Sequence, residues 1–232
     1  MKKLLIYAAT GNKHKMREFR QIFSEAFPPE KGWEVDILPE KEAAPGYIPL
    51  PETGKTFLDN SLIKSKGLCD FLFAHPSLVS SDYDYFLVMA DDSGLSVDAL
   101  GGDPGVHSAR YAAPEGSDTN SPDEENLAKL LRVMKDIPWG ERQAQFVCAI
   151  TCFAWKKDFG APVYCSAEAR VEGEITFESR GENGFGYDPV FYVERFGKTT
   201  SEMSPEEKNE ISHRGKACRQ AAEKVYGIYK EM

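Results

Sequence analysis

The stretch LVMADDSGLSVDALGGDPGVHSARYA, from Leu87 to Ala112, places two adjacent carboxylates directly after an apolar run. The run Phe86–Ala90 is typical of a buried strand, and Asp91 and Asp92 follow it. Adjacent like charges at the end of a buried strand are costly unless a cation lies beside them. Open α/β sheets bind ligands at the carboxyl ends of their strands. The stretch therefore predicts an α/β protein with a charged ligand site at this strand end.

Asp91 and Asp92 are expected to have different roles, because neighbouring residues of an extended chain point to opposite faces. One carboxylate would face the ligand while the other bonds to the scaffold. A divalent metal would relieve the charge, since Mg²⁺ commonly joins a few carboxylates to substrate phosphates. The alternative interpretation is that both residues form a turn ahead of Gly94.

The composition indicates a folded protein with a small ligand. The 232 residues are 41% hydrophobic and 12% aromatic, which supports a sizeable core, and the formal net charge is −9. A nucleic-acid polymer is a poor partner for this charge, whereas a small phosphorylated ligand needs only a few placed cations. We expect a single domain over residues 1–232.

The cysteines and the N-terminus favour a cytoplasmic protein. The five cysteines include no CxxC pair, as expected for reduced cysteines that pack in a core. Met1-Lys2-Lys3 precedes only six apolar residues, too few for a signal peptide or a membrane-spanning helix. We therefore expect no membrane partner.

Apolar periodicity predicts strands and helices along the whole chain. The expected strands are Leu4–Ala9, Trp33–Leu38, Phe86–Ala90, Gln145–Trp155 and Val163–Val171, with a turn at Glu172-Gly173. Helices are expected after Asn12, from the box Thr56–Asp59, from Ser121 and from Ser204. Residues 39–54 and 74–84 read as exposed connections. The pattern predicts a mixed α/β fold, in which helices flank a central sheet of long strands.

The segment ATGNKHK, from Ala9 to Lys15, links the first predicted strand to a helix. A bend at Gly11 leaves backbone N–H groups at the helix start, where anions bind readily. Asn12 and Lys15 add an amide and an ammonium group. The segment is neither a Walker A loop nor a GxGxxG fingerprint, and the alternative is a capped helix with solvated lysines.

The segment ETGKTFLDNSLIKSK, from Glu52 to Lys66, offers a second set of polar groups. Asn60 and Lys64 are four residues apart, so on a helix they share one face. Glu52 lies just upstream, which puts a carboxylate, an amide and a cation within reach of one ligand. The alternative is an amphipathic helix with a charged outer face.

Two further segments, ENGFGYDPVF and EEKNEISHRG, suit a planar base. Phe185 and Tyr187 lie among glycines and could stack on it. Lys208 and Arg214 add cations, and His213 adds a donor or acceptor. The alternative for His213 is a surface histidine on a helix. The histidines have neither HxH nor HExxH spacing, so zinc is not expected.

Five stretches of the chain resemble the Ham1/RdgB family of inosine triphosphate pyrophosphatases, which act on noncanonical purine nucleotides. They occur in the family's order across nearly the whole chain, which is improbable by chance. The stretches are ATGNKHK (Ala9–Lys15), ETGKTFLDNSLIK (Glu52–Lys64), ADDSGLSVDALGGDPGVHSARYA (Ala90–Ala112), GENGFGYDPVF (Gly181–Phe191) and SPEEKNEISHRGKA (Ser204–Ala217).

The resemblance implies an elongated, two-lobed α/β fold with a nucleotide cleft between the lobes, usually as a homodimer. It implies hydrolysis of ITP, dITP and XTP to the monophosphate and pyrophosphate, which cleanses the nucleotide pool. Mg²⁺ is the implied cofactor, with Mn²⁺ as a substitute.

The resemblance also implies roles for individual residues. Asp92 matches the proton acceptor and a metal ligand, and Glu52 matches a second metal carboxylate. The substrate contacts match Thr10, Gly11, Asn12, Lys13, His14, Lys15, Lys64, Ser93, Phe185, Gly186, Tyr187, Asp188, Lys208, His213 and Arg214. The phosphate contacts among these are Thr10, Asn12, Lys15 and Lys64, and the base-side loop is Phe185–Asp188.

Two features depart from the family pattern. Asp59 stands where the family commonly has Glu, one methylene longer, so a carboxylate role there stays open. Residues 74–85 form a longer connection than many members have, which could alter the cleft edge or a dimer contact.

Two other functions stay open from the sequence. A nucleotide-binding module without turnover would need the phosphate and base contacts but not the carboxylates. A Maf-like pyrophosphatase would act on other nucleotides through a related fold. The sequence also does not separate a proton-accepting role of Asp92 from a role as metal ligand alone.

Overall fold

The computed structural model describes residues 1–117, 119–158 and 160–232, without the side chains at positions 14, 205 and 209. A sheet of seven strands has the order β2-β1-β3-β4-β5-β6-β7. The strands are β1 (Lys2–Ala8), β2 (Trp33–Pro39), β3 (Tyr85–Val97), β4 (Gln143–Lys156), β5 (Val163–Ile175), β6 (Phe191–Val193) and β7 (Lys198–Thr199). The α-helices are α1 (Lys13–Ala26), α2 (Glu40–Ala43), α3 (Phe57–Ala74), α4 (Asp123–Val133), α5 (Pro205–Ile211) and α6 (His213–Glu231). The predicted mixed α/β class with a helix-flanked sheet is confirmed.

The chain forms two compact units. The first unit comprises Met1–Asp92, Ala149–Ala169 and Arg214–Met232, and the second comprises Ser93–Cys148 and Arg170–His213. Strands β3, β4 and β5 contribute residues to both units. The single-domain assignment and the nucleotide cleft stay predictions.

Parallel pairing organises the sheet of the first unit. β1 pairs in parallel with β2 and with the start of β3, and its last residue, Ala8, lies opposite Pro39 and Met89. β1 therefore ends two residues before Asp91 in the register of β3. The acid pair lies past the carboxyl end of β1, which is where parallel sheets bind ligands.

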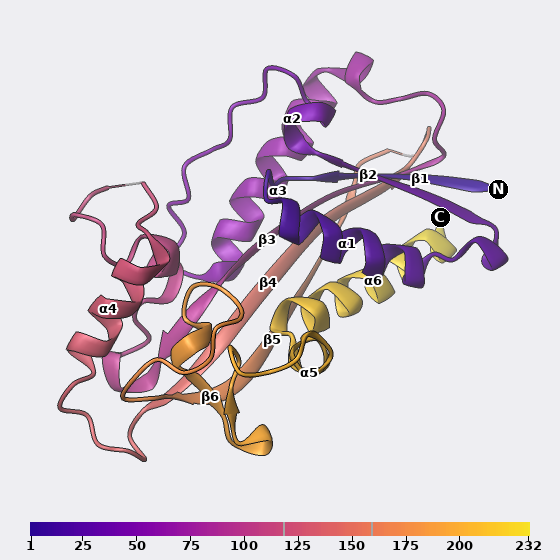
Figure 1. Ribbon diagram of the computed structural model, residues 1–232. Helices are drawn as coiled ribbons and strands as arrows, with labels where there is room; N and C mark the ends of the chain where they lie inside the picture. Colours follow the sequence, from indigo (N-terminus) through magenta and orange to yellow (C-terminus); the bar gives the residue numbers. More distant parts are fainter. Residues whose placement is uncertain (118, 159) are drawn as a thin grey trace. The chain divides into compact units, whose positions relative to one another are not determined.

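Helices cover both faces of this part of the sheet, because alternate strand residues point to opposite sides. One buried cluster packs under α3 and contains Leu5, Tyr7, Leu68, Leu72, Phe86 and Val88. On the opposite face, Tyr229 of α6 contacts Tyr85 edge to face, with ring centroids 5.0 Å apart. Figure 1 shows α1 and α6 side by side, and Glu18 of α1 is ion-paired with Arg214 of α6. The first unit thus places α1, α3 and α6 around the end of β1.

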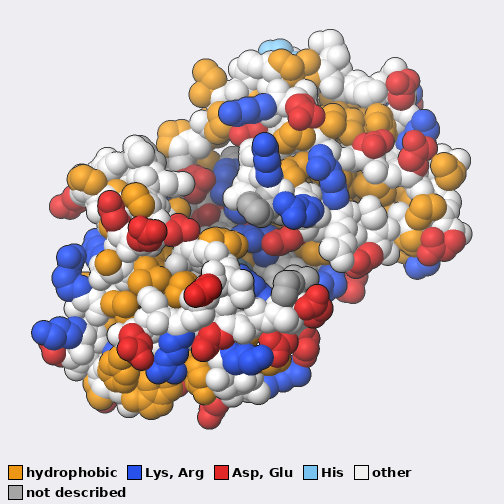
Figure 2. Space-filling view, in the orientation of Figure 1, with side chains coloured by type: hydrophobic (Ala, Val, Ile, Leu, Met, Phe, Trp, Pro, Cys, Tyr) orange, Lys and Arg blue, Asp and Glu red, His pale blue; other side chains and the backbone are white. Residues whose placement is uncertain are grey.

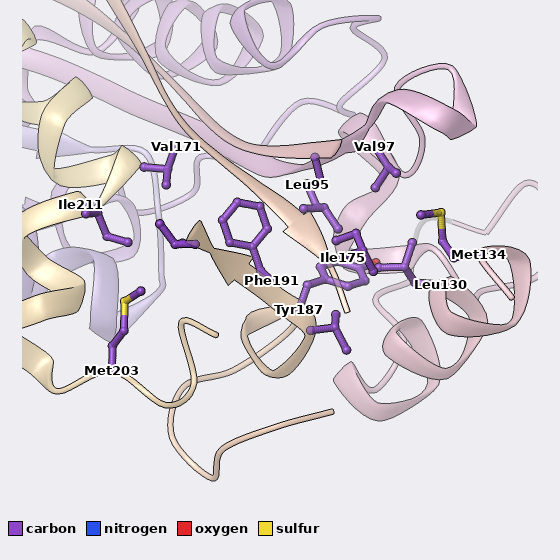
Figure 3. Close-up of a cluster of buried hydrophobic side chains, with 13 residues drawn as sticks. Leu95, Val97, Leu130, Met134, Val171, Ile175, Tyr187, Phe191, Met203 and Ile211 are labelled. Carbon is purple, nitrogen blue, oxygen red and sulfur yellow. The ribbon is translucent and has the colours of Figure 1, made fainter. Parts of the chain in front are cut away.

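The second unit has its own hydrophobic core. Figure 3 shows side chains converging from β3, α4, β5 and β6, among them Leu95, Leu130, Ile175 and Phe191. Beside this core, the buried guanidinium of Arg142 donates to the carbonyl oxygens of Met134, Ile137, Ile175 and Thr176. These bonds tie the end of β5 to the turn that precedes β4.

The strand that carries the aspartates is longer than predicted. β3 does not end at Ala90 but continues through Asp91 and Asp92 to Val97. The prediction failed because adjacent carboxylates were taken as a strand end, whereas cations from α1, α3 and α6 offset their charge. Leu95 and Val97 are buried beyond the acids, so burial of apolar side chains continues the strand.

The predicted turn at Glu172-Gly173 is wrong, because β5 runs without interruption to Ile175. A Cβ atom at Gly173 would lie 2.5 Å from the carbonyl oxygen of Tyr192 and 2.7 Å from the ring of Phe191. Glycine at this position therefore permits close approach of β6 and does not mark a turn.

The loops also differ in detail from the sequence reading. The exposed connection expected at 39–54 contains α2, whose Ala43 is buried. In the 74–84 connection, Leu78, Val79 and Tyr83 pack against the core of the first unit. None of the five cysteines, all of which lie in the described ranges, forms a disulfide, and four of them are buried, as expected for core packing. Within the described residues, no helix is long and apolar enough to span a membrane.

Charges of both signs share the surface drawn in Figure 2. Lys and Arg side chains are interspersed there with Asp, Glu and apolar side chains. A ligand that approaches this face would therefore meet local clusters of charge and not a broad basic surface.

Candidate active site

A cavity of about 240 Å³ opens in the first unit where β1 and β2 end. It is lined by Ala9, Thr10, Lys15, Glu40, Tyr47, Pro49, Leu50, Glu52, Lys64 and Asp91. Two lysines and three carboxylic acids thus converge on one pocket from β3, the helices α1, α2 and α3, and the loop before α3. Four of these lining residues, Thr10, Lys15, Glu52 and Lys64, are predicted site residues.

Asp91 is the buried anchor of the pocket. Its Oδ2 lies 2.9 Å from Lys15 Nζ and 3.3 Å from Arg214 Nε. Burial alone would raise the pKa of Asp91, but Lys15 and Arg214 more than offset it and hold the pKa at about 2. The carboxylate is therefore ionised at neutral pH, and it fixes both cations. This is the scaffold role expected of one member of the acid pair.

A second carboxylate, besides Asp91, also holds Arg214 in place. Its Nη1 lies 3.5 Å from Glu18 Oε2, and its side chain is almost fully buried. Asp91 and Glu18 together orient the planar guanidinium, whose donors have a rigid geometry. The sequence reading placed Arg214 near the base but did not foresee these two carboxylate partners.

Asp92 has a different environment from its neighbour. Lys64 Nζ lies 3.6 Å from its Oδ1, and Asn60 Nδ2 donates to its Oδ2 at 3.1 Å. Burial raises the pKa of Asp92, and Lys64 only partly offsets this effect. A carboxylate with a raised pKa is a better proton acceptor than an ordinary aspartate. The two aspartates are thus divided between scaffold and chemistry, as their alternation predicts.

Lys64 joins Asp92 to the loop before α3. Its Nζ also lies 3.2 Å from Glu52 Oε1. Burial would lower the pKa of Lys64, but Asp92, Asp91 and Glu52 outweigh this effect and raise it. Lys64 therefore stays charged and lies between two carboxylates.

Asn60 joins Asp92 to the loop before α3, and its contact with a ligand stays a prediction. It is fully buried, its Nδ2 bonds to Asp92, and its Oδ1 accepts from the backbone N–H of Gly54 at 2.8 Å. A Cβ atom on Gly54 would lie 2.7 Å from that Oδ1, so the contact requires glycine. Asp59 closes a capping box with Thr56, which gives its carboxylate a structural role.

The ATGNKHK segment forms a capped helix start. Asn12 Oδ1 accepts from the backbone N–H of Lys15 at 3.2 Å, and Thr10 Oγ1 accepts from that of Asn12 at 3.2 Å. The capping alternative is thus present, and Lys15 nevertheless points at Asp91 in the pocket and not into solvent. Gly11 and Lys13 are exposed, and the side chain of His14 lies outside the described part of the chain.

The remaining predicted contacts belong to the second unit, where Asp188 organises the glycine-rich loop. Its Oδ2 accepts from the backbone N–H of Phe185 at 2.8 Å and lies 2.6 Å from Lys208 Nζ. Thr200 Oγ1 donates to its Oδ1 at 2.9 Å. The carboxylate of Asp188 therefore holds the loop in shape and fixes Lys208.

The aromatic residues of this loop do not play equal parts. Phe185 is 62% exposed, with Lys208 Nζ 5.1 Å from its ring centre, which fits a stacking surface. Tyr187 instead packs in the core and donates its hydroxyl hydrogen to the carbonyl of Ser108, so its ring is not the stacking face that the sequence suggested. His213 stacks on Phe146, with ring centroids 5.1 Å apart. The substrate contacts of Phe185, Tyr187, His213, Ser93 and Gly186 stay predictions.

Comparison with known proteins identifies the family. The model of the Ham1 family matches residues 6–224. The chain belongs to the Ham1 family. The dITP/XTP pyrophosphatase of Geobacillus kaustophilus is 45% identical over 217 residues, which cover 94% of this chain and 91% of that protein.

Solved Ham1 structures also resemble this fold over almost its whole length. The HAM1 protein from Coxiella burnetii aligns with a TM-score of 0.74 and 31% identity, over 98% of this chain and all (100%) of that one. The Staphylococcus aureus Ham1 protein aligns with a TM-score of 0.73 and 34% identity, over 96% and 98% of the two chains.

The pocket of this Ham1 protein has the donors that Mg²⁺ prefers. Carboxyl groups outnumber ammonium groups in its lining, so a polyanionic ligand would need an additional cation there. Asp91 Oδ1 is buried without a hydrogen-bond partner among the described residues. No group of three or more His, Cys, Asp or Glu side chains in the described ranges is arranged to hold a metal by itself. Mg²⁺ usually takes one or two carboxylates and completes its shell with phosphates and water, which suits Glu52 and Asp92.

Glu40 and Tyr47 line the pocket but were missed in the sequence. Burial raises the pKa of Glu40, and Lys41 and Lys64 only partly offset it. Both residues were read as part of an exposed loop. Glu40 directly follows the last residue of β2, so the rule that ligands bind at the carboxyl ends of strands could have found it. No comparable signal marks Tyr47.

Proposed function

We propose that this chain hydrolyses the noncanonical purine nucleotides ITP, dITP and XTP to the monophosphate and pyrophosphate. The observation that carries the proposal is Asp92, a carboxylate of raised pKa held by Lys64 and Asn60 beside the pocket. Relatives over most of the chain, including those of Geobacillus kaustophilus and Escherichia coli, are named dITP/XTP pyrophosphatase. The proposal includes a cytoplasmic homodimer that uses Mg²⁺ or Mn²⁺.

The mechanism is an in-line attack of water on the α-phosphorus. A bond forms between the water oxygen and this phosphorus, and the bond to the oxygen that bridges to the β-phosphorus breaks. Asp92 accepts the proton of the water, and pyrophosphate leaves with the bonding electron pair. The enzyme must position the water and offset the charge of the triphosphate.

The pocket residues divide these tasks. Lys15 and Lys64 supply positive charge to the phosphates, and Asp91 keeps Lys15 in place. Glu52 and Asp92 would hold Mg²⁺. When bound, the metal would add the largest local charge and polarise the phosphoryl oxygens.

Turnover of a nucleotide panel tests the function. Purified protein is expected to release pyrophosphate, and not phosphate, from ITP, dITP and XTP in the presence of Mg²⁺. Preference for UTP or dTTP would favour the Maf-like alternative, and tight binding without product would favour a binding module. ATP is the matched control, since it differs from ITP at position 6 of the base.

Replacing Lys15 with alanine is expected to weaken triphosphate binding without changing base preference. A hydrogen bond to a charged group contributes about 1.5–3 kcal/mol, so KM should rise about tenfold to a hundredfold. Lys64→Ala should act in the same direction. Steady-state kinetics with ITP and ATP measures both effects.

Lys66→Ala is the matched control, because Lys66 is exposed on α3 and pairs only with a surface residue, Asp70, in the contacts described. It should leave KM within about twofold of the wild-type value. A Lys15→Ala variant that keeps its affinity but accepts ATP would show that Lys15 reads the base.

A further inference from the structure

A chain of buried hydroxyl groups lies beside the carboxylates of the first unit. Ser61, Ser65 and Thr151 are each 0% exposed. Thr151 Oγ1 lies 2.9 Å from Ser61 Oγ and 2.7 Å from Ser65 Oγ. Ser61 Oγ donates to the carbonyl oxygen of Ala90 at 2.9 Å. The hydroxyl chain therefore joins α3 to β3 and β4 at once.

The hydrogen bonds of this chain have one direction. Each hydroxyl has a single hydrogen to donate, and Ser61 uses its own on Ala90. Thr151 must then donate to Ser61. Ser65 lies 2.7 Å from Thr151 Oγ1 and 3.3 Å from the carbonyl oxygen of Leu62, so its hydrogen goes to the nearer acceptor, Thr151. Hydroxyl groups linked head to tail strengthen one another, and removal of one leaves a buried neighbour unsatisfied. Thr151 is the central link, because it accepts one bond and donates the next.

The same helix carries the two residues that hold Asp92. Asn60 and Lys64 share one face of α3, and Ser61 and Ser65 form the neighbouring stripe, one residue further along. Ser61 fixes α3 against Ala90, two residues before Asp92 in β3. A shift of α3 at this point would change both the Asn60 and the Lys64 contact with Asp92.

We propose that the hydroxyl chain Ser65–Thr151–Ser61 positions Asn60 and Lys64 on Asp92 during hydrolysis. The proposal rests on the function proposed above and makes these three residues positioning residues. Apolar side chains could fill the same space, but they would fix α3 by shape alone. The hydroxyl chain adds a directional bond to the backbone next to the acid pair.

Two substitutions at Thr151 separate shape from hydrogen bonding. Thr151→Val keeps the shape and loses the hydroxyl, and it is expected to lower kcat for ITP about tenfold or more, with KM changed less than about threefold. Thr151→Ser keeps the hydroxyl and should retain at least about a third of kcat. If Thr151→Val does not fold, Ser65→Ala removes the far end of the hydroxyl chain. This variant is also expected to lower kcat while KM changes little.

Thr176→Val is the matched control for loss of a buried hydroxyl. Thr176 belongs to the second unit, is as buried as Thr151, and donates to the carbonyl of Glu178 at 2.7 Å. The variant should lower the melting temperature but leave kcat within about twofold. An equal loss of kcat in Thr176→Val would mean that the fall at Thr151 reflects stability alone, and would overturn the proposal.

A double-mutant cycle tests whether Thr151 acts through Lys64. In a Lys64→Ala background, adding Thr151→Val should lower kcat by a smaller factor, less than about threefold. An equal fall in both backgrounds would overturn the proposal, as would a folded Thr151→Val variant with unchanged kcat. Wild-type protein in the same assay keeps the two ideas apart, because failure of the wild type to release pyrophosphate contradicts the function and not the positioning role.

Discussion

Asp92→Asn is expected to lower kcat/KM for ITP by about a hundredfold or more while the protein stays folded. The substitution keeps the size of the side chain and removes its charge and its capacity to accept a proton. It also removes one carboxylate from the pair with Glu52 that would hold Mg²⁺. Steady-state pyrophosphate release measures the effect, and thermal unfolding shows whether the fold is retained.

The contacts of Asp92 explain why asparagine is a poor substitute. Both carboxylate oxygens face donors, Lys64 Nζ on one side and Asn60 Nδ2 on the other. An amide has one acceptor and one donor end, so at position 92 it satisfies one neighbour and opposes the other. Loss of charge also leaves Lys64 with its ion pair to Glu52 and the attraction of the Asp91 charge.

Asp70→Asn is the matched control for loss of an ion-paired aspartate outside the site. Asp70 is exposed on α3, where it pairs with Lys66. This variant should keep kcat/KM within about twofold of wild type, because exposed ion pairs contribute little. Asp92→Asn activity within about tenfold of wild type, or about 1.4 kcal/mol of barrier, would contradict the assigned role of Asp92.

The sequence predicts most of the fold, because apolar periodicity records which faces are buried. β1, β2 and α1 were found in this way, and the capping box at Thr56 marked the start of α3. The errors came from residues that usually end a strand or form a turn but here have tertiary contacts that keep them within a strand. Asp91 looked like a strand end until Lys15 and Arg214 were placed beside it, and Gly173 looked like a turn until β6 was placed against it.

The sequence also predicts which residues meet at the site but not how they pair. Lys15, Glu52 and Lys64 do line one pocket. Residue type alone could not show that Lys15 holds Asp91 while Lys64 holds Asp92, since either pairing satisfies the charges. Thr151 carried no signal at all, because a buried threonine in an apolar strand resembles ordinary packing until its partners from α3 are known.

Selectivity for the bases of ITP, dITP and XTP requires a hydrogen-bond donor of the protein that faces position 6 of the purine. Inosine and xanthosine carry an oxygen acceptor there, and adenine carries an amino donor. A guanidinium has only donors and stays charged, whereas the donor pattern of a histidine depends on its tautomer. Arg214 is therefore a stronger candidate than His213. Asp91 and Glu18 hold its guanidinium in one orientation, as selective recognition requires.

Arg214→Ala is expected to narrow the ratio of kcat/KM for ITP over ATP by about a hundredfold or more. A site built around a hydrogen bond rejects the mismatched analogue by roughly 10⁴–10⁵, so loss of the donor should remove much of that discrimination. The ratio is the decisive measurement, because the variant also removes a partner of Asp91 and can lower both rates.

Arg214→Lys keeps a cation for Asp91 and loses the planar guanidinium, so it should recover stability but not the full ratio of kcat/KM for ITP over ATP. Phe185→Ala should lower both rates by similar factors, since stacking accepts any base. An unchanged ratio in Arg214→Ala would place the base-reading donor elsewhere, in backbone amides of the C-terminal segment.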